Sequence, residues 1–177
     1  MKLWDKGIAI NQLIETFTIG RDTEMDIFLA EFDVLGSLAH IKMLESIGLL
    51  TSAELGSLII ALREIYNDIK AGKFEIESGS EDVHTQVELM LTRKLGDVGK
   101  KIHSGRSRND QVLLDLKLFT RSEIKTVVEQ TVDLFEVLVA QSEKYKGVLM
   151  PGYTHLQVAM PSSFGLGRVV QPFWLVP

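Results

Sequence analysis

The segment DQVLLDLKLFTRSEIKTVVEQTVDLFEVLVAQSEKYK, residues 110–146, contains neither proline nor glycine. Its apolar side chains recur at the three- and four-residue steps of one helix face: Leu113, Leu116, Phe119, Ile124, Val127, Val128, Leu134, Phe135 and Leu138. About 35 helical residues extend roughly 50 Å. Because so long a helix cannot bury itself within a compact chain of 177 residues, it predicts a helical bundle, formed within the chain or between subunits.

The prolines extend this expectation to most of the chain. They lie at 151, 161, 172 and 177, so the first 150 residues contain none. Proline breaks helix interiors and marks turns, so this distribution argues against a turn-rich sandwich or barrel. The sequence therefore predicts the all-α fold class.

Local signals divide the N-terminal part into shorter helices. Apolar spacing predicts helices at 27–50 and 51–71 that form a helical hairpin, the second opened by a capping box. Ser80 can cap a third helix that runs to about residue 95. Residues 96–108 have little helical pattern and are expected to form a constrained loop.

Composition excludes several classes of protein. Apolar residues make up 45% of the chain and charged residues 24%, which indicates a folded protein. No uncharged run approaches the roughly 18 residues that span a bilayer, and the first residues lack the apolar core of a signal peptide. The absence of cysteine makes a cytoplasmic location the default, and the net charge of −5 argues against nonspecific nucleic-acid binding.

The stretch KKIHSGRSRND, residues 100–110, directly precedes the long helix. Gly105 allows close approach of the backbone, Arg106 and Arg108 can bind oxyanions with two hydrogen bonds each, and the helix N-terminus adds positive potential. These features favour a pocket for a carboxylate or a phosphate. The alternative is a solvated basic loop in which Asn109 or Asp110 caps the helix.

Two further stretches contain histidine. In MPGYTHLQ, residues 150–157, Thr154, His155 and Gln157 offer a hydroxyl, an imidazole and an amide just after the long helix. Histidine is the usual proton-transfer group near neutral pH, although a turn between two helices with a hydrogen-bonded histidine is also consistent with this pattern. His84 and Glu88 form an i,i+4 pair, which is most often surface decoration.

Other chemistries lose their usual sequence support. The chain has no histidine and acid set with zinc spacing and no Gly-rich nucleotide loop, and it lacks the G-x-S-x-G elbow of serine hydrolases. We therefore expect no metal site.

Three stretches taken in order resemble the argininosuccinate lyase family of the fumarase/aspartase superfamily: EDVHT at 81–85, KIHSGRSRNDQ at 101–111 and MPGYTHLQ at 150–157. The similarity extends from Leu3 and Trp4 to about Gly165. The resemblance implies cleavage of argininosuccinate to arginine and fumarate without a metal or organic cofactor. In that reaction a base removes a proton beside a succinyl carboxylate, and the guanidino nitrogen leaves with help from an acid.

The resemblance also implies roles for individual residues. Ser107, Arg108 and Asn109 would bind substrate, Thr154 would bind a carboxylate, and His155 would transfer the proton. His84 and Gln157 lie in matched motifs and would support the site. The family is a homotetramer whose active sites combine residues of three subunits.

The resemblance further implies an N-terminal helical domain over 1–109, ending in the substrate-binding loop, and the start of a central helical bundle over 110–177. Family members are longer, and their catalytic serine loop has no counterpart here, nor does an early Asn-x-Ser element near Phe17. Residues 167–177 contain two prolines where the family continues as a bundle helix. These departures suggest a truncated or frameshifted reading of a longer gene.

Two other functions remain open at this stage. The chain could be a noncatalytic helical subunit or interaction protein that kept the fold. It could also be an anion or nucleic-acid binder that uses residues 100–108, although its acidic charge argues against that function.

Overall fold

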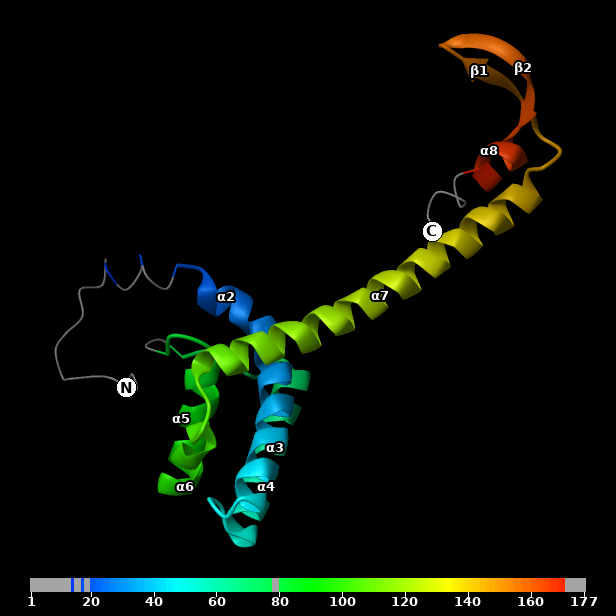
Figure 1. Ribbon diagram of the computed structural model, residues 1–177. Coiled ribbons are helices and arrows are strands. Elements are labelled where there is room, and N and C mark those ends of the chain that lie inside the picture. The colour runs from blue at the N-terminus through cyan, green and yellow to red at the C-terminus, as the bar shows by residue number, and fades with distance from the viewer. Residues whose placement is uncertain (1–13, 15–16, 18–19, 78–79, 171–177) are drawn as a thin grey trace. The chain divides into compact units, whose positions relative to one another are not determined.

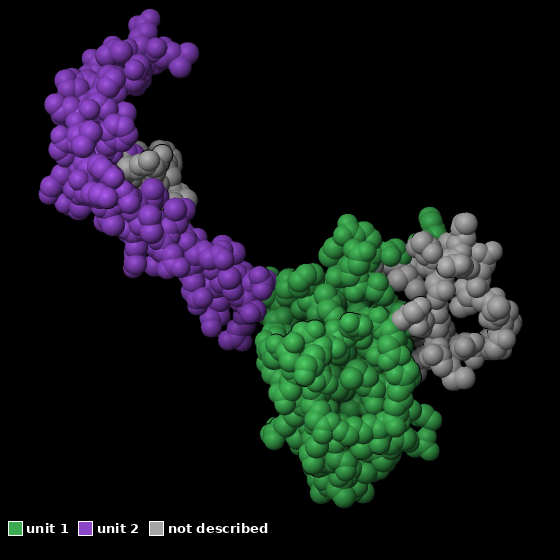
Figure 2. All heavy atoms as spheres, turned by 180° about the vertical axis from the view of Figure 1, so that it is seen from behind, with its two compact units in different colours: residues 1–120 green, residues 121–177 purple. Residues whose placement is uncertain are grey.

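The computed structural model describes residues 14, 17, 20–77 and 80–170, which belong to two compact units (Figure 2). The first unit covers residues 1–120 and the second covers 121–177. The fold is all-α, as predicted, apart from one β-hairpin in the second unit. None of the described helices is long and apolar enough to cross a membrane. The expected elements near Leu3, Phe17 and Pro172 lie wholly or partly outside the described residues.

The core of the first unit is built on two helices that pack side by side, α3 (Ala30–Ser46) and α4 (Ser52–Lys70) (Figure 1). A short helix α2 (Asp22–Asp26) and a 3₁₀ turn η1 (Ile27–Leu29) precede α3. Fully buried side chains of α3 and α4 form the centre of the core: Ala30, Val34, Ile41, Leu44, Leu58 and Leu62. The predicted helical hairpin is confirmed.

The predicted capping box of α4 is also confirmed. The backbone N–H of Glu54 donates to the Thr51 hydroxyl, and the Thr51 N–H donates to the Glu54 carboxylate at 2.8 Å. Two N–H groups that the helix cannot satisfy internally are therefore bonded at its start.

The next helix, α5 (Val83–Leu95), begins differently from the expectation. Its cap is Asp82, whose carboxylate accepts from the Thr85 N–H at 2.8 Å and from the Thr85 hydroxyl. The prediction that Ser80 caps this helix is wrong, because Ser80 is buried and its hydroxyl donates to the side chain of Gln86. A carboxylate at the positive end of the helix is the stronger cap.

The expected loop at 96–108 is partly helical. It contains α6 (Asp97–Lys100) and the 3₁₀ turn η2 (Lys101–His103). Gly96 ends α5 with a φ of 62°, and Gly99 lies so close to α5 that an added Cβ would be 2.5 Å from the Leu91 carbonyl. The spacing of apolar residues does not predict a helix in this segment, because α6 depends on its contact with α5.

The long helix is α7 (Arg108–Lys144), as predicted. The Asp110 N–H donates to the Ser107 hydroxyl at 3.4 Å, and the Ser107 N–H donates to the Asp110 carboxylate at 2.8 Å. Ser107 therefore caps the helix, and Asp110 is the third residue inside it, so the alternative that Asn109 or Asp110 is the cap is wrong. Within the first unit Phe119 packs edge to face on Phe32 of α3, with ring centroids 6.0 Å apart.

The second unit contains the rest of α7, followed by β1 (Leu149–Thr154), β2 (Gln157–Ser163) and α8 (Phe164–Val170). The two strands pair antiparallel, and Pro151 lies opposite Pro161 (Figure 1). The expectation of a simple turn between helices is therefore wrong. The Ser142 hydroxyl donates to the Gly165 carbonyl at 2.7 Å and ties α8 to α7. The described part of the tail after 167 is helical as far as Val170.

Gly99 and Gly56 form a matched pair for testing the α5–α6 contact. Gly99→Ala should lower the free energy of unfolding by about 1–3 kcal/mol, because the methyl group must displace the backbone of α5. Gly56→Ala lies inside α4 with nothing within 4 Å of the added Cβ, and should raise it by about 0.5–1 kcal/mol. Urea denaturation measures both; equal effects of the two variants would contradict this packing.

Candidate active site

One face of α3 holds the loop that precedes α7. Asp33, Ser37 and His40 are spaced by four and three residues, so they share a face of the helix. Ser37 accepts a hydrogen bond from Arg106 Nη2 at 3.0 Å. His40 Nε2 lies 2.8 Å from the Ser104 carbonyl oxygen and donates to it, since a carbonyl only accepts. Two contacts from α3 thus fix the loop on either side of Gly105.

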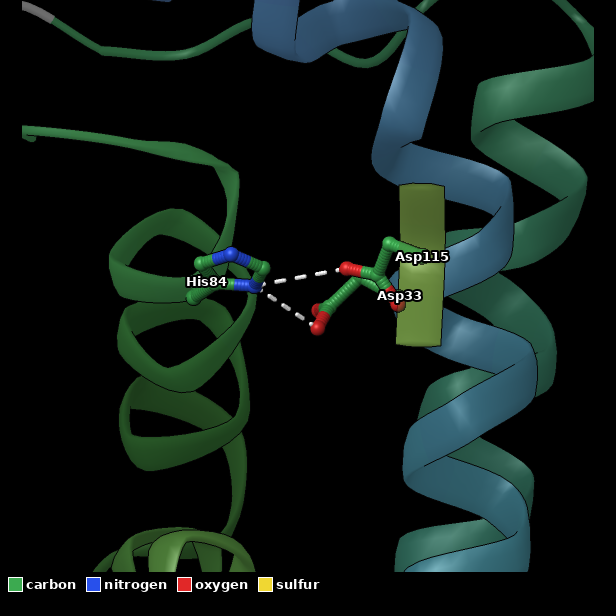
Figure 3. A group of neighbouring side chains, drawn as sticks. All are labelled: Asp33, His84 and Asp115. Atoms are coloured by element: carbon green, nitrogen blue, oxygen red, sulfur yellow. Dashed lines mark hydrogen bonds and ion pairs between the residues drawn. The ribbon is translucent and has the colours of Figure 1, made fainter. Parts of the chain in front are cut away.

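Asp33, the remaining residue of this face of α3, belongs to a buried cluster. Asp33 of α3 and Asp115 of α7 both face the ring of His84 of α5 (Figure 3). His84 Nδ1 lies 2.9 Å from Asp33 Oδ1 and 3.7 Å from Asp115 Oδ2. Gln111 Nε2 also donates to Asp33 Oδ1 at 3.2 Å. All four side chains are buried, so three helices meet at one set of ionisable groups.

The surroundings shift the pKa values of this cluster. Burial by itself lowers the pKa of His84, but the hydrogen bond to Asp33 and the carboxylates of Asp33, Asp82 and Asp115 raise it above 6.5 overall. Burial, together with the charge of Asp33, raises the pKa of Asp115 to about 7, although His84 and Arg106 oppose this. The surroundings therefore favour the charged form of His84 and disfavour the charged form of Asp115.

The atoms of this cluster also have a spacing that suits a metal ion, since one ligand atom of each residue lies within 4.8 Å of the others. Charge balance favours a different description. The positive groups beside the two carboxylates are His84, whose pKa is raised, and the neighbouring Arg106 guanidinium, while the raised pKa of Asp115 reduces the negative charge of the cluster. The group thus supplies its own positive charge.

The motifs that carry Arg108 and His84 meet in the first unit. Arg108 Nη1 lies 2.8 Å from Asp82 Oδ2 and 3.2 Å from Glu81 Oε2, and its Nη2 donates to the Thr85 hydroxyl at 3.1 Å. The side chain is about one-quarter exposed. The structure therefore anchors Arg108 at the start of α5, while Ser107 and Asn109 are exposed at the start of α7.

A small cavity of about 10 Å³ lies among these groups, with His84, Glu88, His103 and Arg106 in its wall. Glu88 is half-buried, and burial raises its pKa while the nearby cations of His103, Arg108 and Arg106 oppose the rise. The prediction that His84 and Glu88 form a pair at the surface is therefore wrong, because His84 is buried and faces the carboxylates of other helices instead.

Thr154, His155 and Gln157 lie in the second unit, at the tip of the hairpin. Thr154 pairs with Gln157, and the two residues between them have φ values of 48° for His155 and 63° for Leu156. A two-residue turn with both φ values positive usually contains glycine or asparagine, so histidine and leucine carry backbone strain here. All three predicted residues are exposed.

The structure thus brings together His84, Ser107, Arg108 and Asn109 within the first unit, and Thr154, His155 and Gln157 within the second. Sequence reasoning missed Asp33, Asp115 and Gln111 as site residues. Asp115 follows Gln111 by one helical turn inside an apolar segment, and this pattern could have indicated a buried polar face.

Comparison with known proteins assigns the family. A family model described as "Lyase" matches residues 7–170, so the chain belongs to this lyase family. It is 69% identical over 165 residues to the argininosuccinate lyase of Bacteroides fragilis, an alignment that covers 93% of this chain and 37% of that protein. The resemblance inferred from the three motifs is confirmed. The chain spans little more than a third of the length of the curated relatives it matches.

Solved structures show the same fold. A fumarate lyase/delta crystallin from Brucella melitensis matches with a TM-score of 0.73 at 15% identity, over 99% of this chain and 44% of that one. An EDDS lyase variant with bound fumarate matches with a TM-score of 0.68 at 23% identity, over 96% of this chain and 33% of that one. Both likenesses show the fold alone, and they agree with the predicted all-α class.

The raised pKa of Asp115 predicts how stability depends on pH. An acid whose pKa is about 7 when folded and about 3.9 when unfolded makes the fold less stable as pH rises between those values. Asp115→Asn removes this loss. Its free energy of unfolding should therefore rise relative to wild type by roughly 2–4 kcal/mol between pH 4 and pH 7, at about 1.4 kcal/mol per pKa unit.

Asp110→Asn is the matched control on the same helix. Hydrogen bonds from the Ser107 backbone and side chain lower the pKa of Asp110, so its stabilisation is present above the unfolded pKa and is lost as pH falls. Asp110→Asn should thus differ most from wild type at neutral pH, with the opposite sign. Urea denaturation across this pH range measures the free energies of unfolding of both variants. If the difference between wild type and Asp115→Asn does not change with pH, burial does not disfavour the charged form of Asp115 as described.

Proposed function

We propose that this chain takes part in the cleavage of argininosuccinate to arginine and fumarate. The observation that carries the proposal is the anchoring of Arg108 at the start of α5, which joins two of the three motifs on which the resemblance to argininosuccinate lyases rests. The coarser statement, membership of a lyase family that acts on small molecules, follows from the match over residues 7–170.

The loop before α7 supplies the binding part of the proposed site. Ser107 and Asn109 are exposed at the N-terminus of α7, where the helix dipole favours a carboxylate. Arg108 adds a positive charge held in place by Asp82. Fixed donors stabilise charge that develops on the succinyl carboxylates more than they stabilise the ground state.

The hairpin supplies the proton-transfer part. His155 would move the proton, with the Thr154 hydroxyl bonded to a carboxylate and Gln157 in support. His155 is exposed and has a left-handed backbone conformation, which fits a functional rather than a packing role. Strained turns occur where the surrounding structure enforces them for function. An elimination of this kind needs a base, an acid and anion stabilisation, so the proposal includes no cofactor.

The proposed enzyme is a cytoplasmic homo-oligomer, a tetramer by family resemblance. Support comes from apolar side chains on the α7 part of the second unit that are about half exposed: Ile124, Val127, Val128, Val132, Leu134 and Val137. Such a face is typical of a subunit interface or a bundle contact. The two halves of the predicted site would then be completed by other subunits.

A noncatalytic subunit is the second candidate. The observation that favours it is the pairing of Arg108 with Glu81 and Asp82, which already occupies hydrogen-bonding positions of the guanidinium. An open pocket of about 310 Å³ lined by Gln141, Tyr145, Val148 and Phe164 also offers apolar surface to a partner. Turnover of argininosuccinate distinguishes this candidate from the lyase.

A chimaera tests the lyase directly. Residues 7–170 of this chain replace the matched part of the Bacteroides fragilis enzyme, and fumarate absorbance follows turnover of argininosuccinate. We expect the chimaera to be active and His155→Ala to lower kcat by about 10²–10⁴, the usual contribution of a positioned proton-transfer group.

Asn109→Ala should raise KM or lower kcat in the same chimaera, whereas Lys146→Ala, whose exposed side chain pairs with Glu143, serves as the control and should match the parent. A folded but inactive chimaera, or a His155→Ala variant as active as the parent, would contradict the proposed function.

Self-association of the unaltered chain is the second test. Light scattering should give a mass that is a multiple of 19.8 kDa. Val128→Glu should lower that mass, because it puts a charge on the exposed apolar face of α7, while Glu129→Gln on the next position should not. A monomeric wild-type chain would contradict the proposed oligomer.

A further inference from the structure

Two carboxylates from different helices face one nitrogen of the same ring. Asp33 Oδ1 and Asp115 Oδ2 lie 2.9 and 3.7 Å from His84 Nδ1, and both dashed lines end on this nitrogen rather than on the other ring nitrogen (Figure 3). A carboxylate that has lost its proton can only accept a hydrogen bond. Asp33 therefore places a proton on Nδ1 and sets the orientation of the ring.

We propose that Asp33, assisted by Asp115, is a positioning residue that holds His84 as a buried imidazolium whose Nε2–H is directed away from the two acids, as a donor within the proposed site. The assignment of His84 to that site rests on the proposed function, whereas the state of the ring does not. Asp33 acts through His84 and need not touch the substrate.

The packing explains why both acids are needed. A buried imidazolium is costly unless it is paired, and one hydrogen bond offsets only part of that cost. Asp115 adds a second negative group with no donor to its Oδ2 among the described residues, and Asp33 Oδ2 is likewise a buried acceptor without a donor there. The unmet acceptors favour a positive charge between them.

Other ionisable groups around the ring do not change this result. Asp82, which precedes α5, adds a third negative charge, while Arg106 from the loop acts mainly on Asp33 and Asp115. Glu88 lies one turn further along α5, and His103 of η2 lies in the wall of the same small cavity. The acids thus surround His84 from α3, α5 and α7.

The orientation of Asp33 is itself fixed from a second side. Gln111 Nε2 donates to Asp33 Oδ1, the same oxygen that accepts from His84. Asparagine at position 33 would keep the size of the side chain but could offer its N–H₂ group to Nδ1. The ring would then accept at Nδ1 and keep its proton on Nε2, which is the neutral form of the opposite tautomer.

Nitrogen NMR of the full chain labelled with ¹⁵N-histidine tests this inference. The chain has four histidines, and His84→Gln identifies the His84 signals by their loss. In wild type at pH 7 we expect two similar ring-nitrogen shifts, the signature of an imidazolium. Asp33→Asn should give two widely separated shifts with the proton on Nε2, while Glu88→Gln, the control in the cavity wall, should leave the imidazolium signature unchanged.

A neutral His84 ring in wild type at pH 7, or an Asp33→Asn variant that keeps the imidazolium signature, would overturn the inference. If Asp33→Asn does not fold, Asp115→Asn replaces it and should move the titration of His84 to lower pH; an unmoved titration would overturn the role of Asp115. An active chimaera with a neutral His84 ring would refute this inference alone, and an inactive chimaera with a charged ring would refute the lyase alone.

Discussion

The hydrogen bond between Asp33 and His84, with Asp115 beside it, is the interaction on which the first unit depends. It joins α3, α5 and α7 at one buried point, although Asp33 and His84 are 51 positions apart in the sequence. Apolar packing could stabilise these helices as well, since buried ion pairs often add little net stability. An ion cluster, however, requires its charged groups to lie in one particular arrangement. The face of α3 that carries Asp33 also holds Ser104 and Arg106, so the same helix that fixes His84 fixes the loop before α7.

This arrangement brings together groups that suit the proposed binding of an anion. The start of α5 supplies the acids that hold Arg108, and the start of α7 supplies exposed donors beside it. Both helix N-termini thus meet around one arginine. The histidine proposed to move the proton lies elsewhere, on a strained turn of the second unit. In the proposed function, binding and proton transfer belong to different segments of the chain, which fits a family site assembled from several segments.

Local signals predicted the elements whose cause is local. The long helix, the α3–α4 pair and the capping box at Thr51 follow from spacing and end chemistry within the element. The β-hairpin was not predicted, because each of Pro151 and Pro161 by itself indicates a turn. Only the pairing of these two prolines between β1 and β2 makes them part of strands. The candidate site divides in the same way. Ser107, Arg108 and Asn109 were predicted from one short motif, whereas the approach of Asp33 and Asp115 to His84 depends on contacts between helices that are distant in sequence.

A double-mutant cycle between Asp33 and His84 tests the central claim most directly. Asp33→Asn, His84→Gln and the double variant are unfolded in urea at pH 6, where the ring is charged. We predict a coupling free energy of about 1–3 kcal/mol, because each single change leaves a buried partner without its counter-group. Additive effects of the two substitutions, within about 0.5 kcal/mol, would show that the pair does not hold the three helices together and would contradict the account.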